Sequence, residues 1–282
     1  MKRKIVFILN PHSGTDNKTR MPKLIEDNID KKAFDYEVVF TEYAGHAADI
    51  AYDCANKGVD IVVAVGGDGT IIDGAHYSAG FGLPVLGINA GRLGFLAQVE
   101  PRQADKAFDR ILNGGYTIEE RFGLSLSRES RAGEELLVSY ALNDIVLTKP
   151  VTNNIIDLTI DCDGRRLGAY TADGLILSTP TGSTAYSLSA GGPVIDPGLQ
   201  AISIVPICPH SISVRPIVIS GERTVTIRCR QAMCITEDGR ERINILPDSA
   251  VTVRRSQRAA RLVSFGEYEF FEILSNKLLQ RG

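Results

Sequence analysis

The sequence predicts an α/β N-terminal domain, a parallel sheet flanked by helices, and a mostly antiparallel β-sandwich C-terminal domain. Two observations support this expectation. Over residues 1–120, short apolar runs alternate with stretches of helical spacing, which is typical of a parallel sheet covered by helices. Over residues 121–265, strand-like runs follow one another with turn signals between them and few helices. The tail, 266–282, has helical spacing again, and we expect it to pack back on the first domain.

The expected elements of the first domain follow from the spacing of apolar residues. Strands are predicted over 5–9, 36–40, 60–65 and 84–88, and helices over 17–30, 46–57 and 101–113. The run over 60–65 is apolar on both faces, as in a buried parallel strand. Gly58 and the Gly114-Gly115 pair follow two of the helices and are plausible ends for them.

The second half contains shorter runs that are rich in β-branched residues. Turns are expected at Asp163-Gly164 and at Asp238-Gly239. A helix is expected over 270–279. The predicted strands cover 136–147, 155–162, 174–178, 214–219, 224–229, 234–236 and 250–254.

Composition excludes several classes of protein. The 282 residues are 44% hydrophobic and 23% charged, with a net charge of −3, so nothing indicates binding to nucleic acid or to an anionic membrane. No apolar run approaches the roughly 18 residues of a membrane span, and the run at 5–9 is too short for a secretory signal. The five cysteines are scattered and form no C-x-x-C pair, which predicts reduced thiols in a cytoplasmic protein.

A glycine-rich loop follows the third predicted strand. Gly66-Gly67-Asp68-Gly69-Thr70 lies between that strand and helical sequence, a geometry that brings backbone N–H groups to a phosphate. An acidic residue in such a loop is explained if it handles Mg²⁺ or removes a proton from an attacking hydroxyl. The alternative is a tight turn with Asp68 as a helix N-cap.

A second glycine-rich loop, 87–96, follows the next strand. Ligands of open parallel sheets gather at the carboxyl ends of the strands, so both loops are expected at one edge of the sheet.

Two polar segments stand out in the second half. Asn143-Asp144 interrupts an apolar strand, so one side chain faces inward unless a bulge re-aims it. A ligand with hydroxyls and amides would satisfy both, and the alternative is a bulge at the rim of a sheet. Residues 173–193 follow with hydroxyls and small side chains around a Gly and a Pro, which suits a ribose and phosphates but also a structural loop.

Taken together, the loop at 66–70, the Asn143-Asp144 pair and the stretch 173–193 resemble the three signature motifs of the bacterial ATP-NAD kinase family, in order and spacing. Residues 87–96 and 208–216 resemble further segments of that family, so the resemblance covers roughly 5–253. The motif at 173–193 is highly specific, whereas Gly-Gly-Asp-Gly alone is shared with lipid kinases and phosphofructokinases.

The resemblance implies a fold and an activity. The two domains would hold the site between them, and the enzyme would be a phosphotransferase with an alcohol acceptor. It would phosphorylate the 2′-hydroxyl of the adenosine ribose of NAD with ATP, giving NADP. The divalent metal, expected to be Mg²⁺, would come bound to ATP rather than to protein ligands. A homodimer or homotetramer in the cytoplasm is expected, with no nucleic acid or membrane partner.

The resemblance also implies roles for residues. Asp68 would accept the proton of the ribose hydroxyl, and Asn143 and Asp144 would hold NAD. Asp173 and Thr181 would line the site. Further nucleotide contacts would come from Gly69, Asn154, Thr184, Ala185, Tyr186, Ser187, Leu188 and Ser189, with Gly66, Gly67 and Thr70 in the phosphate loop.

The chain departs from the family at two positions, and one histidine is open to two interpretations. Many relatives have Arg where this chain has Thr171, and His or Arg where it has Asn154. Both positions would lie near the adenosine ribose. His210 is expected to have a structural role, such as a hydrogen bond with the backbone.

Two other functions remain to be weighed. A lipid kinase shares the Gly-Gly-Asp-Gly loop, but the segment 173–193 argues against it. A non-catalytic NAD-binding module is disfavoured by Asp68, because a pure binder gains nothing from an acid beside phosphates.

Overall fold

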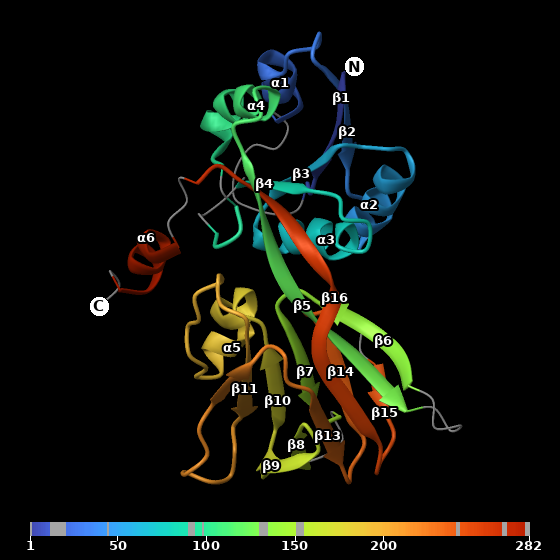
Figure 1. The fold of residues 1–282 in the computed structure, drawn as a ribbon, viewed down its shortest axis with the longest axis vertical. Helices are drawn as coiled ribbons and strands as arrows, with labels where there is room; N and C mark the ends of the chain where they lie inside the picture. The colour runs from blue at the N-terminus through green and yellow to red at the C-terminus, as the bar shows by residue number, and fades with distance from the viewer. Residues whose placement is uncertain are drawn as a thin grey trace. The chain divides into compact units, whose positions relative to one another are not determined.

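The computed structural model describes residues 2–11, 21–43, 45–89, 94–97, 99–129, 135–150, 155–240, 243–266 and 270–279. The chain forms two compact units. The first comprises Met1–Glu120 and Ala259–Gly282, and the second comprises Arg121–Arg258. The first is an α/β unit and the second consists of antiparallel sheets, which confirms the predicted fold class (Figure 1).

The first unit is built on a parallel sheet with the strand order β2-β1-β3-β4. The end of a long strand, β16, joins the sheet beside β4 through Leu262, which is paired with Val85. The strands are β1 (Arg3–Leu9), β2 (Phe34–Phe40), β3 (Ile61–Gly66), β4 (Val85–Asn89) and β16 (Ala250–Ser264); the helices are α1 (Met21–Asn28), α2 (His46–Asn56), α3 (Asp68–Ser78) and α4 (Ala104–Leu112), with a 3-10 turn at Pro101–Gln103.

The alternation of side chains along β3 explains why helices cover this sheet. Val63 and Val65 join a buried cluster with residues of α1 and α4, such as Phe108. Ala64 points to the opposite face, where a Cβ added to Gly74 of α3 would lie 3.6 Å from its methyl group. Both faces of β3 are therefore buried, as its apolar sequence predicts for a parallel strand.

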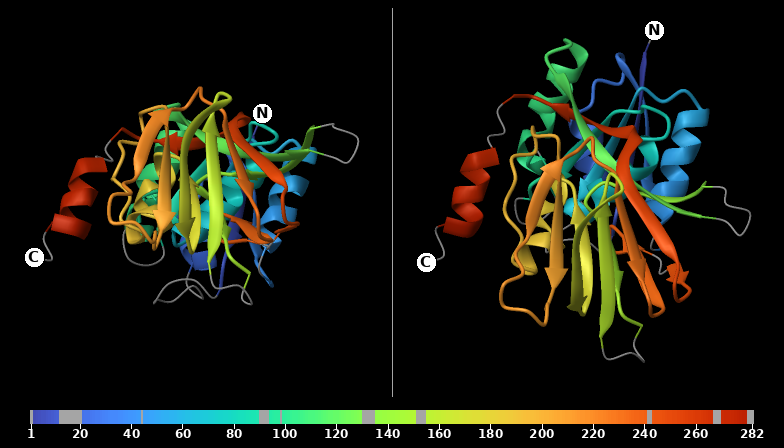
Figure 2. Two further views of the ribbon diagram at one scale, coloured as in Figure 1. Left: turned by 90° about the horizontal axis from the view of Figure 1, so that it is seen from below. Right: turned by 60° about the horizontal axis from the view of Figure 1, so that its bottom comes forward.

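The second unit contains two sheets. One has the order β16-β13-β8-β9, with β5 paired to β16 and β6 paired to β5, and the other has the order β12-β11-β10-β7-β14-β15 (Figure 2). The strands are β5 (Thr117–Glu129), β6 (Glu135–Ala141), β7 (Asp144–Thr148), β8 (Ile156–Cys162), β9 (Arg165–Ala172), β10 (Gly174–Ser178), β11 (Ala201–Ile207), β12 (Ile217–Ser220), β13 (Val225–Cys229), β14 (Met233–Glu237) and β15 (Ile243–Ile245).

One buried cluster joins the two sheets face to face. Leu158 and Ile227 enter it from the first sheet, and Leu147, Leu177 and Ile204 enter it from the second. All five side chains are almost completely buried. The arrangement is that of a β-sandwich, in which the inner faces of two sheets form the core.

The structure corrects one predicted strand and adds others. The run over 136–147 is not one strand, because β6 ends at Ala141 and β7 begins at Asp144 in the other sheet. The strands β5, β9, β11 and β15 were not predicted. Two short helices were also missed, a 3-10 turn at Thr181–Thr184 and α5 (Tyr186–Ser189).

The C-terminal segment of the first unit contacts the loop that follows β4. It forms α6 (Phe270–Leu274) and a π-helical turn at Ser275–Leu279. The ring centroid of Phe270 lies 5.9 Å from that of Phe95, and the Lys277 ammonium lies 4.8 Å from the centroid of the same ring.

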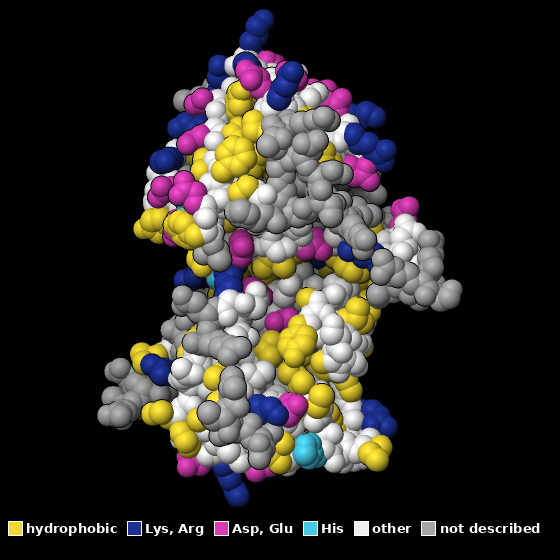
Figure 3. All heavy atoms as spheres, turned by 180° about the vertical axis from the view of Figure 1, so that it is seen from behind, with side chains coloured by type: hydrophobic (Ala, Val, Ile, Leu, Met, Phe, Trp, Pro, Cys, Tyr) yellow, Lys and Arg dark blue, Asp and Glu magenta, His cyan; other side chains and the backbone are white. Residues whose placement is uncertain are grey.

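The surface and the helix lengths agree with the composition. Basic and acidic side chains are interspersed on the visible face of the first unit and form no single-sign patch there (Figure 3). Within the described part of the chain, no helix is long and apolar enough to cross a membrane.

Candidate functional site

The loop after β3 has the predicted strand–turn–helix geometry. Gly66 is the last residue of β3, Gly67 is the N-cap of α3, and Asp68 is its first residue. A Cβ added to Gly67 or Gly69 would meet nothing within 4 Å, so the space beside the loop is open. The first N–H groups of a helix have no partner within it, which makes this N-terminus suited to an anion such as phosphate.

The Asp68 carboxylate holds the two glycine-rich loops together. It accepts hydrogen bonds from the N–H of Phe95 (2.8 Å to Oδ2) and from the N–H of Leu96 (3.2 Å to Oδ1). Gly94 approaches so closely that a Cβ there would lie 1.8 Å from Oδ1. Each carboxylate oxygen can accept more than one hydrogen bond, so capacity remains for the proton of a bound hydroxyl.

The alternative role of Asp68 as a helix N-cap is wrong. Gly67 occupies that position, and no side chain caps the helix there. The Asp68 side chain points instead to the loop after β4, because β3 and β4 are adjacent parallel strands whose ends, Gly66 and Asn89, lie side by side. The loops predicted to share one edge of the sheet do so.

In the second unit, the Asn143-Asp144 pair lies where the chain leaves one sheet for the other. Asn143 precedes β7, and Asp144 is its first residue, opposite Ser178 of β10. Both side chains are buried. The Oδ1 atom of Asn143 is buried and has no hydrogen-bond partner among the described residues, which suits a ligand that donates there.

The polar loop after β10 packs directly on this pair. The Thr179 N–H donates to the Asn143 carbonyl (2.8 Å), and the Thr179 hydroxyl donates to the Leu142 carbonyl (2.7 Å). A Cβ on Gly182 would lie 2.2 Å from the Asn143 carbonyl oxygen. The structure therefore brings together two motifs that are far apart in the sequence.

A third segment, the turn after β14, completes the surroundings of the pair. The Asp238 carboxylate accepts hydrogen bonds from the N–H groups of Leu142 (2.8 Å), Asn143 (2.7 Å) and Asp144 (3.2 Å). Burial, and secondarily the negative charge of Asp238, raise the pKa of Asp144 to about 7. Asp144 is thus poised to change charge near neutral pH.

The hydroxyls of the loop after β10 divide into structural and available groups. The Ser183 hydroxyl donates to the Pro180 carbonyl (2.7 Å) and accepts from the Ile195 N–H (3.0 Å), so it stabilises the loop. Thr184 donates weakly to the Thr181 carbonyl (3.4 Å). Among the remaining candidates, Ser187 is fully buried. The others are half-exposed or exposed: Thr181, Ala185, Tyr186, Leu188 and Ser189.

Asp173 lies apart from the other candidates of this unit that the structure describes. It precedes β10 and forms an ion pair with Lys149 (2.6 Å), whereas Thr179 and Thr181 follow the other end of that strand. The five residues of β10 separate Asp173 from Thr179, so the two positions are six steps apart, or about 20 Å at the usual rise per residue. Asn154 lies outside the described residues.

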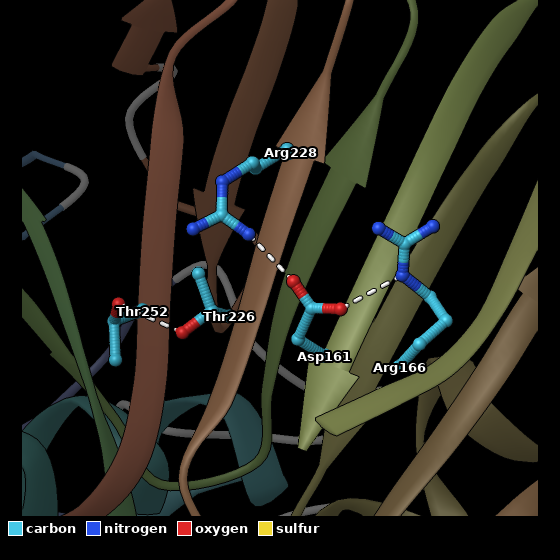
Figure 4. A network of polar contacts seen from close by, with 5 residues as sticks. All are labelled: Asp161, Arg166, Thr226, Arg228 and Thr252. Carbon is cyan, nitrogen blue, oxygen red and sulfur yellow. Dashed lines mark hydrogen bonds and ion pairs between the residues drawn. The ribbon is translucent and has the colours of Figure 1, made fainter. Parts of the chain in front are cut away.

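The outer face of β8, β9 and β13 forms a polar hollow of about 520 Å³ that includes Thr171. The Thr171 hydroxyl donates to Asp157 (2.7 Å), and this bond is the main reason why the pKa of Asp157 is lowered. Nearby, Asp161 accepts from Arg166 (2.8 Å) and Arg228 (2.5 Å), which lowers the pKa of Asp161 (Figure 4). The negative charges of Asp157 and Asp161 offset the positive charges of the arginines around the hollow.

The structural role expected of the His210 side chain stays a prediction, and the structure adds residues that sequence analysis missed. The backbone N–H of His210 donates to the Thr171 carbonyl (2.9 Å), and its side chain is exposed. The missed residues are Asp238 and Lys149. Asp238 was assigned only to a turn, and no local pattern connects it with a segment 94 to 96 residues away.

Comparison with known proteins identifies relatives of both parts of the chain. The model of the ATP-NAD kinase N-terminal domain matches residues 5–116, and that of the ATP-NAD kinase C-terminal domain matches 142–265. A protein named NAD kinase from Geotalea daltonii is 42% identical over 222 residues, covering 78% of each chain. One from Carboxydothermus hydrogenoformans is 34% identical over 268 residues, covering 92% of this chain and 95% of its own.

Two solved structures are similar along nearly the whole chain. Yeast NADH kinase complexed with NADH superposes with a TM-score of 0.82 at 25% identity, covering 99% of this chain and 88% of its own. An NAD kinase from Archaeoglobus fulgidus in complex with ATP superposes with a TM-score of 0.75 at 25% identity, covering 99% and 100%.

The contact between Gly94 and Asp68 makes a testable prediction about stability. Gly94→Ala places a methyl group against the carboxylate and should lower the unfolding free energy by about 1–3 kcal/mol in urea denaturation. Gly69→Ala is the matched control, because open space surrounds Gly69 and Ala gains about 0.5–1 kcal/mol over Gly inside a helix. Equal stability of the two variants would show that the loops are not packed as described.

The raised pKa of Asp144 predicts a pH dependence of stability. The folded state binds its proton up to a pH of about 7, whereas the unfolded state releases it near the usual 3.8. Stability from the protonated carboxyl is therefore complete at low pH and is lost as the pH rises through about 7. Relative to Asp144→Asn, the unfolding free energy of the natural protein should fall as the pH rises from the usual pKa of 3.8 to about 7.

Urea denaturation of both proteins at a series of pH values measures this difference. Asp161→Asn is the control, because the pKa of Asp161 is lowered and its contribution is lost on acidification instead. A constant difference between the natural protein and Asp144→Asn across the interval would rule out a raised pKa at Asp144.

Proposed function

The chain belongs to the ATP-NAD kinase family, and from this membership we propose how its residues phosphorylate NAD. It is an enzyme, a phosphotransferase that uses ATP to convert NAD to NADP at the 2′-hydroxyl of the adenosine ribose. The observation that supports the proposed mechanism best is the Asp68 carboxylate, held at the N-terminus of α3 by two backbone N–H groups.

Asp68 is the proton acceptor of the reaction. The 2′-oxygen of the ribose forms a bond with the γ-phosphorus of ATP, the bond from that phosphorus to the bridging oxygen of ADP breaks, and the hydroxyl proton passes to Asp68. Phosphoryl transfer depends mainly on positioning and on electrostatic stabilisation. A carboxylate fixed by the backbone fits this requirement, because its orientation does not have to be established during the reaction.

The phosphate loop binds the phosphates of ATP. Gly67 and Gly69 leave space for close approach, Gly66 precedes them at the end of β3, and Thr70 follows in the first turn of α3. The helix N-terminus favours negative charge. Mg²⁺ enters as part of the substrate, Mg-ATP. Phosphate oxygens and water commonly supply most ligands of Mg²⁺ in such enzymes.

The second unit binds NAD. The buried Asn143 Oδ1 accepts a hydrogen bond from the dinucleotide, and the Asp144 carboxyl lies beside it. The loop that packs on them provides further contacts, with a partly exposed Tyr186 ring for stacking or hydrogen bonding. The other proposed contacts are Asn154, Thr181, Thr184, Ala185, Ser187, Leu188 and Ser189.

The position of Asp173 supports a homo-oligomer, as a dimer or a tetramer. Asp173 lies about 20 Å along the chain from the other candidates of its unit. We propose that it contacts a dinucleotide bound by a second copy of the chain. The five free cysteines support a reducing compartment, and we assign the enzyme to the cytoplasm.

Replacement of Asp68 tests the proposed mechanism. Asp68→Asn keeps the shape of the side chain and should fold with an unchanged melting temperature, while kcat falls about 10²–10⁴-fold, the usual effect of losing a general base. NADP formation from NAD and Mg-ATP is followed with an NADP-specific dehydrogenase. A folded variant with near-normal kcat would remove Asp68 from the mechanism.

The same assay separates the activity from its alternatives. Diacylglycerol in mixed micelles is the control acceptor, and we expect no phosphorylation of it. Phosphorylated lipid without NADP would indicate a lipid kinase, and NAD binding without any product would indicate a binding module.

Mixing two inactive variants tests whether Asp173 acts in a neighbouring copy. In the proposed dimer, each site combines Asp68 of one chain with Asp173 of the other. In a heterodimer of Asp68→Asn and Asp173→Ala, one site therefore contains both replacements and the other site contains neither. Random exchange of subunits should therefore restore activity at about a quarter of the sites. If both residues act within one chain, every site has one defect, and the mixture stays inactive.

A further inference from the structure

We propose that Asp238 is a positioning residue for NAD binding, holding the backbone of Asn143 and Asp144 in the shape that receives the dinucleotide. The proposal rests on the proposed function, which assigns NAD binding to that pair. Asp238 itself is not proposed to contact the substrate. It acts through the segment where the chain passes from β6 to β7.

Four hydrogen bonds join the turn at Asp238 to that segment. The carboxylate accepts from the N–H groups of Leu142 and Asn143 at 2.8 Å and 2.7 Å and from that of Asp144 at 3.2 Å. In return, the Asp238 N–H donates to the Asp144 carbonyl at 3.0 Å. From the other side, Thr179 binds the carbonyls of Leu142 and Asn143, so the segment is fixed on both sides.

The segment needs a partner of this kind because the chain changes sheets there. Leu142 and Asn143 lie outside both strands, so their N–H groups are not part of a ladder. Buried N–H groups without partners are costly, and a carboxylate with two acceptor oxygens can satisfy three of them. An Asn side chain has only one acceptor oxygen and an NH₂ group that cannot accept.

The conformation of the turn at Asp238 recurs at one other place in the same unit. Asp238 has a φ of 48° and is followed by Gly239 with a φ of 72°. Asp163 and Gly164 form a turn with almost the same angles, 49° and 75°. The Asp163 carboxylate likewise accepts from the backbone N–H of a distant segment, that of Thr224 at 2.9 Å, and its own N–H donates to the Thr224 carbonyl at 2.9 Å, while Arg223 donates to its other oxygen. The turn therefore accounts for the type of contact, and what distinguishes Asp238 is that the segment it holds carries the polar pair.

The charge of Asp238 also acts on Asp144. Burial is the larger cause of the raised pKa of Asp144, and the Asp238 charge is the second. Tyr140 of β6 is under the same influence, since burial and the charge of Asp238 raise its pKa, opposed by Arg240 and Arg258. Glu237 of β14 precedes the turn and pairs with Ile145 in the sheet. Asp238 therefore affects both the position and the protonation of the group beside Asn143.

Kinetics of Asp238→Asn test the proposal, with Asp163→Asn as the matched control. Loss of charge-assisted hydrogen bonds should raise KM for NAD by about 10-fold to 100-fold. KM for ATP should stay unchanged, because the phosphate loop belongs to the other unit. The control removes an aspartate with the same turn geometry and should leave both values unchanged. Asp238→Glu, which keeps the charge and both oxygens, should recover part of the loss.

The pH profile distinguishes positioning from a merely structural role. Removing the charge of Asp238 lowers the pKa of Asp144, so the midpoint of the pH dependence of KM for NAD should move to lower pH in Asp238→Asn. Asp238→Glu should keep the midpoint of the natural protein. If Asp238→Asn only lowered the melting temperature, the pH midpoint and the ratio of KM for NAD to KM for ATP would stay those of the natural protein.

Three outcomes would overturn the proposal. These are an unchanged KM for NAD and midpoint in folded Asp238→Asn, an equal effect in Asp163→Asn, and an equal rise in KM for NAD and for ATP. If the natural protein forms no NADP, the proposed function fails separately, and NAD affinity by calorimetry then decides the role of Asp238. If Asp238→Asn does not fold, the two KM values are compared in Asp238→Glu, whose longer side chain should still raise KM for NAD selectively. An unchanged KM for NAD in that variant would then overturn the proposal.

Discussion

The hydrogen bonds from the Phe95 and Leu96 N–H groups to the Asp68 carboxylate are the interaction on which the account of catalysis depends. Without them, the loops after β3 and β4 would be two separate glycine-rich turns, and the acid would have no fixed orientation. Gly94 makes the contact possible, because any larger residue would occupy the position of the carboxylate. Phe95 is in turn packed by Phe270, so the C-terminal helix contributes to the order of this loop. The Asp68 side chain is therefore held in one orientation at the N-terminus of α3.

The second unit uses the same chemistry for a different purpose. Asp238, like Asp68, accepts hydrogen bonds from backbone N–H groups of a distant segment. At Asp68 the carboxylate remains available to a substrate, whereas at Asp238 it satisfies three N–H groups of the segment that precedes β7. The neighbouring Asp144 is buried and close to that charge, which explains why its pKa is raised to about 7. The polar pair is therefore held through its backbone, and both of its side chains are buried.

Features formed by residues that are close together in the sequence were predicted, and features formed by residues that are far apart were missed. The strand, the glycine-rich turn and the helix of the phosphate loop are contiguous, so their order predicted the geometry around Asp68. The interruption at Asn143-Asp144 was noticed, but the run around it was wrongly expected to be one strand, because hydrophobic spacing does not show that a chain changes sheets. Strand β11 was missed, and Pro206 within it is a residue that usually argues against a central strand. Asp238 could not be found, because its partners depend on the pairing of β14 with β7, which lie far apart in the sequence.

The central claim is that Asp68 takes the proton of the adenosine 2′-hydroxyl. The most direct measurement is a crystal structure of the protein with NAD and a non-reactive analogue of ATP bound together. The account predicts that the 2′-hydroxyl oxygen lies within hydrogen-bonding distance of an Asp68 carboxylate oxygen, about 2.6–3.2 Å, and faces the γ-phosphate. A complex in which that hydroxyl is bound to another base, or in which Asp68 turns away from the ribose while both substrates are in place, would contradict it.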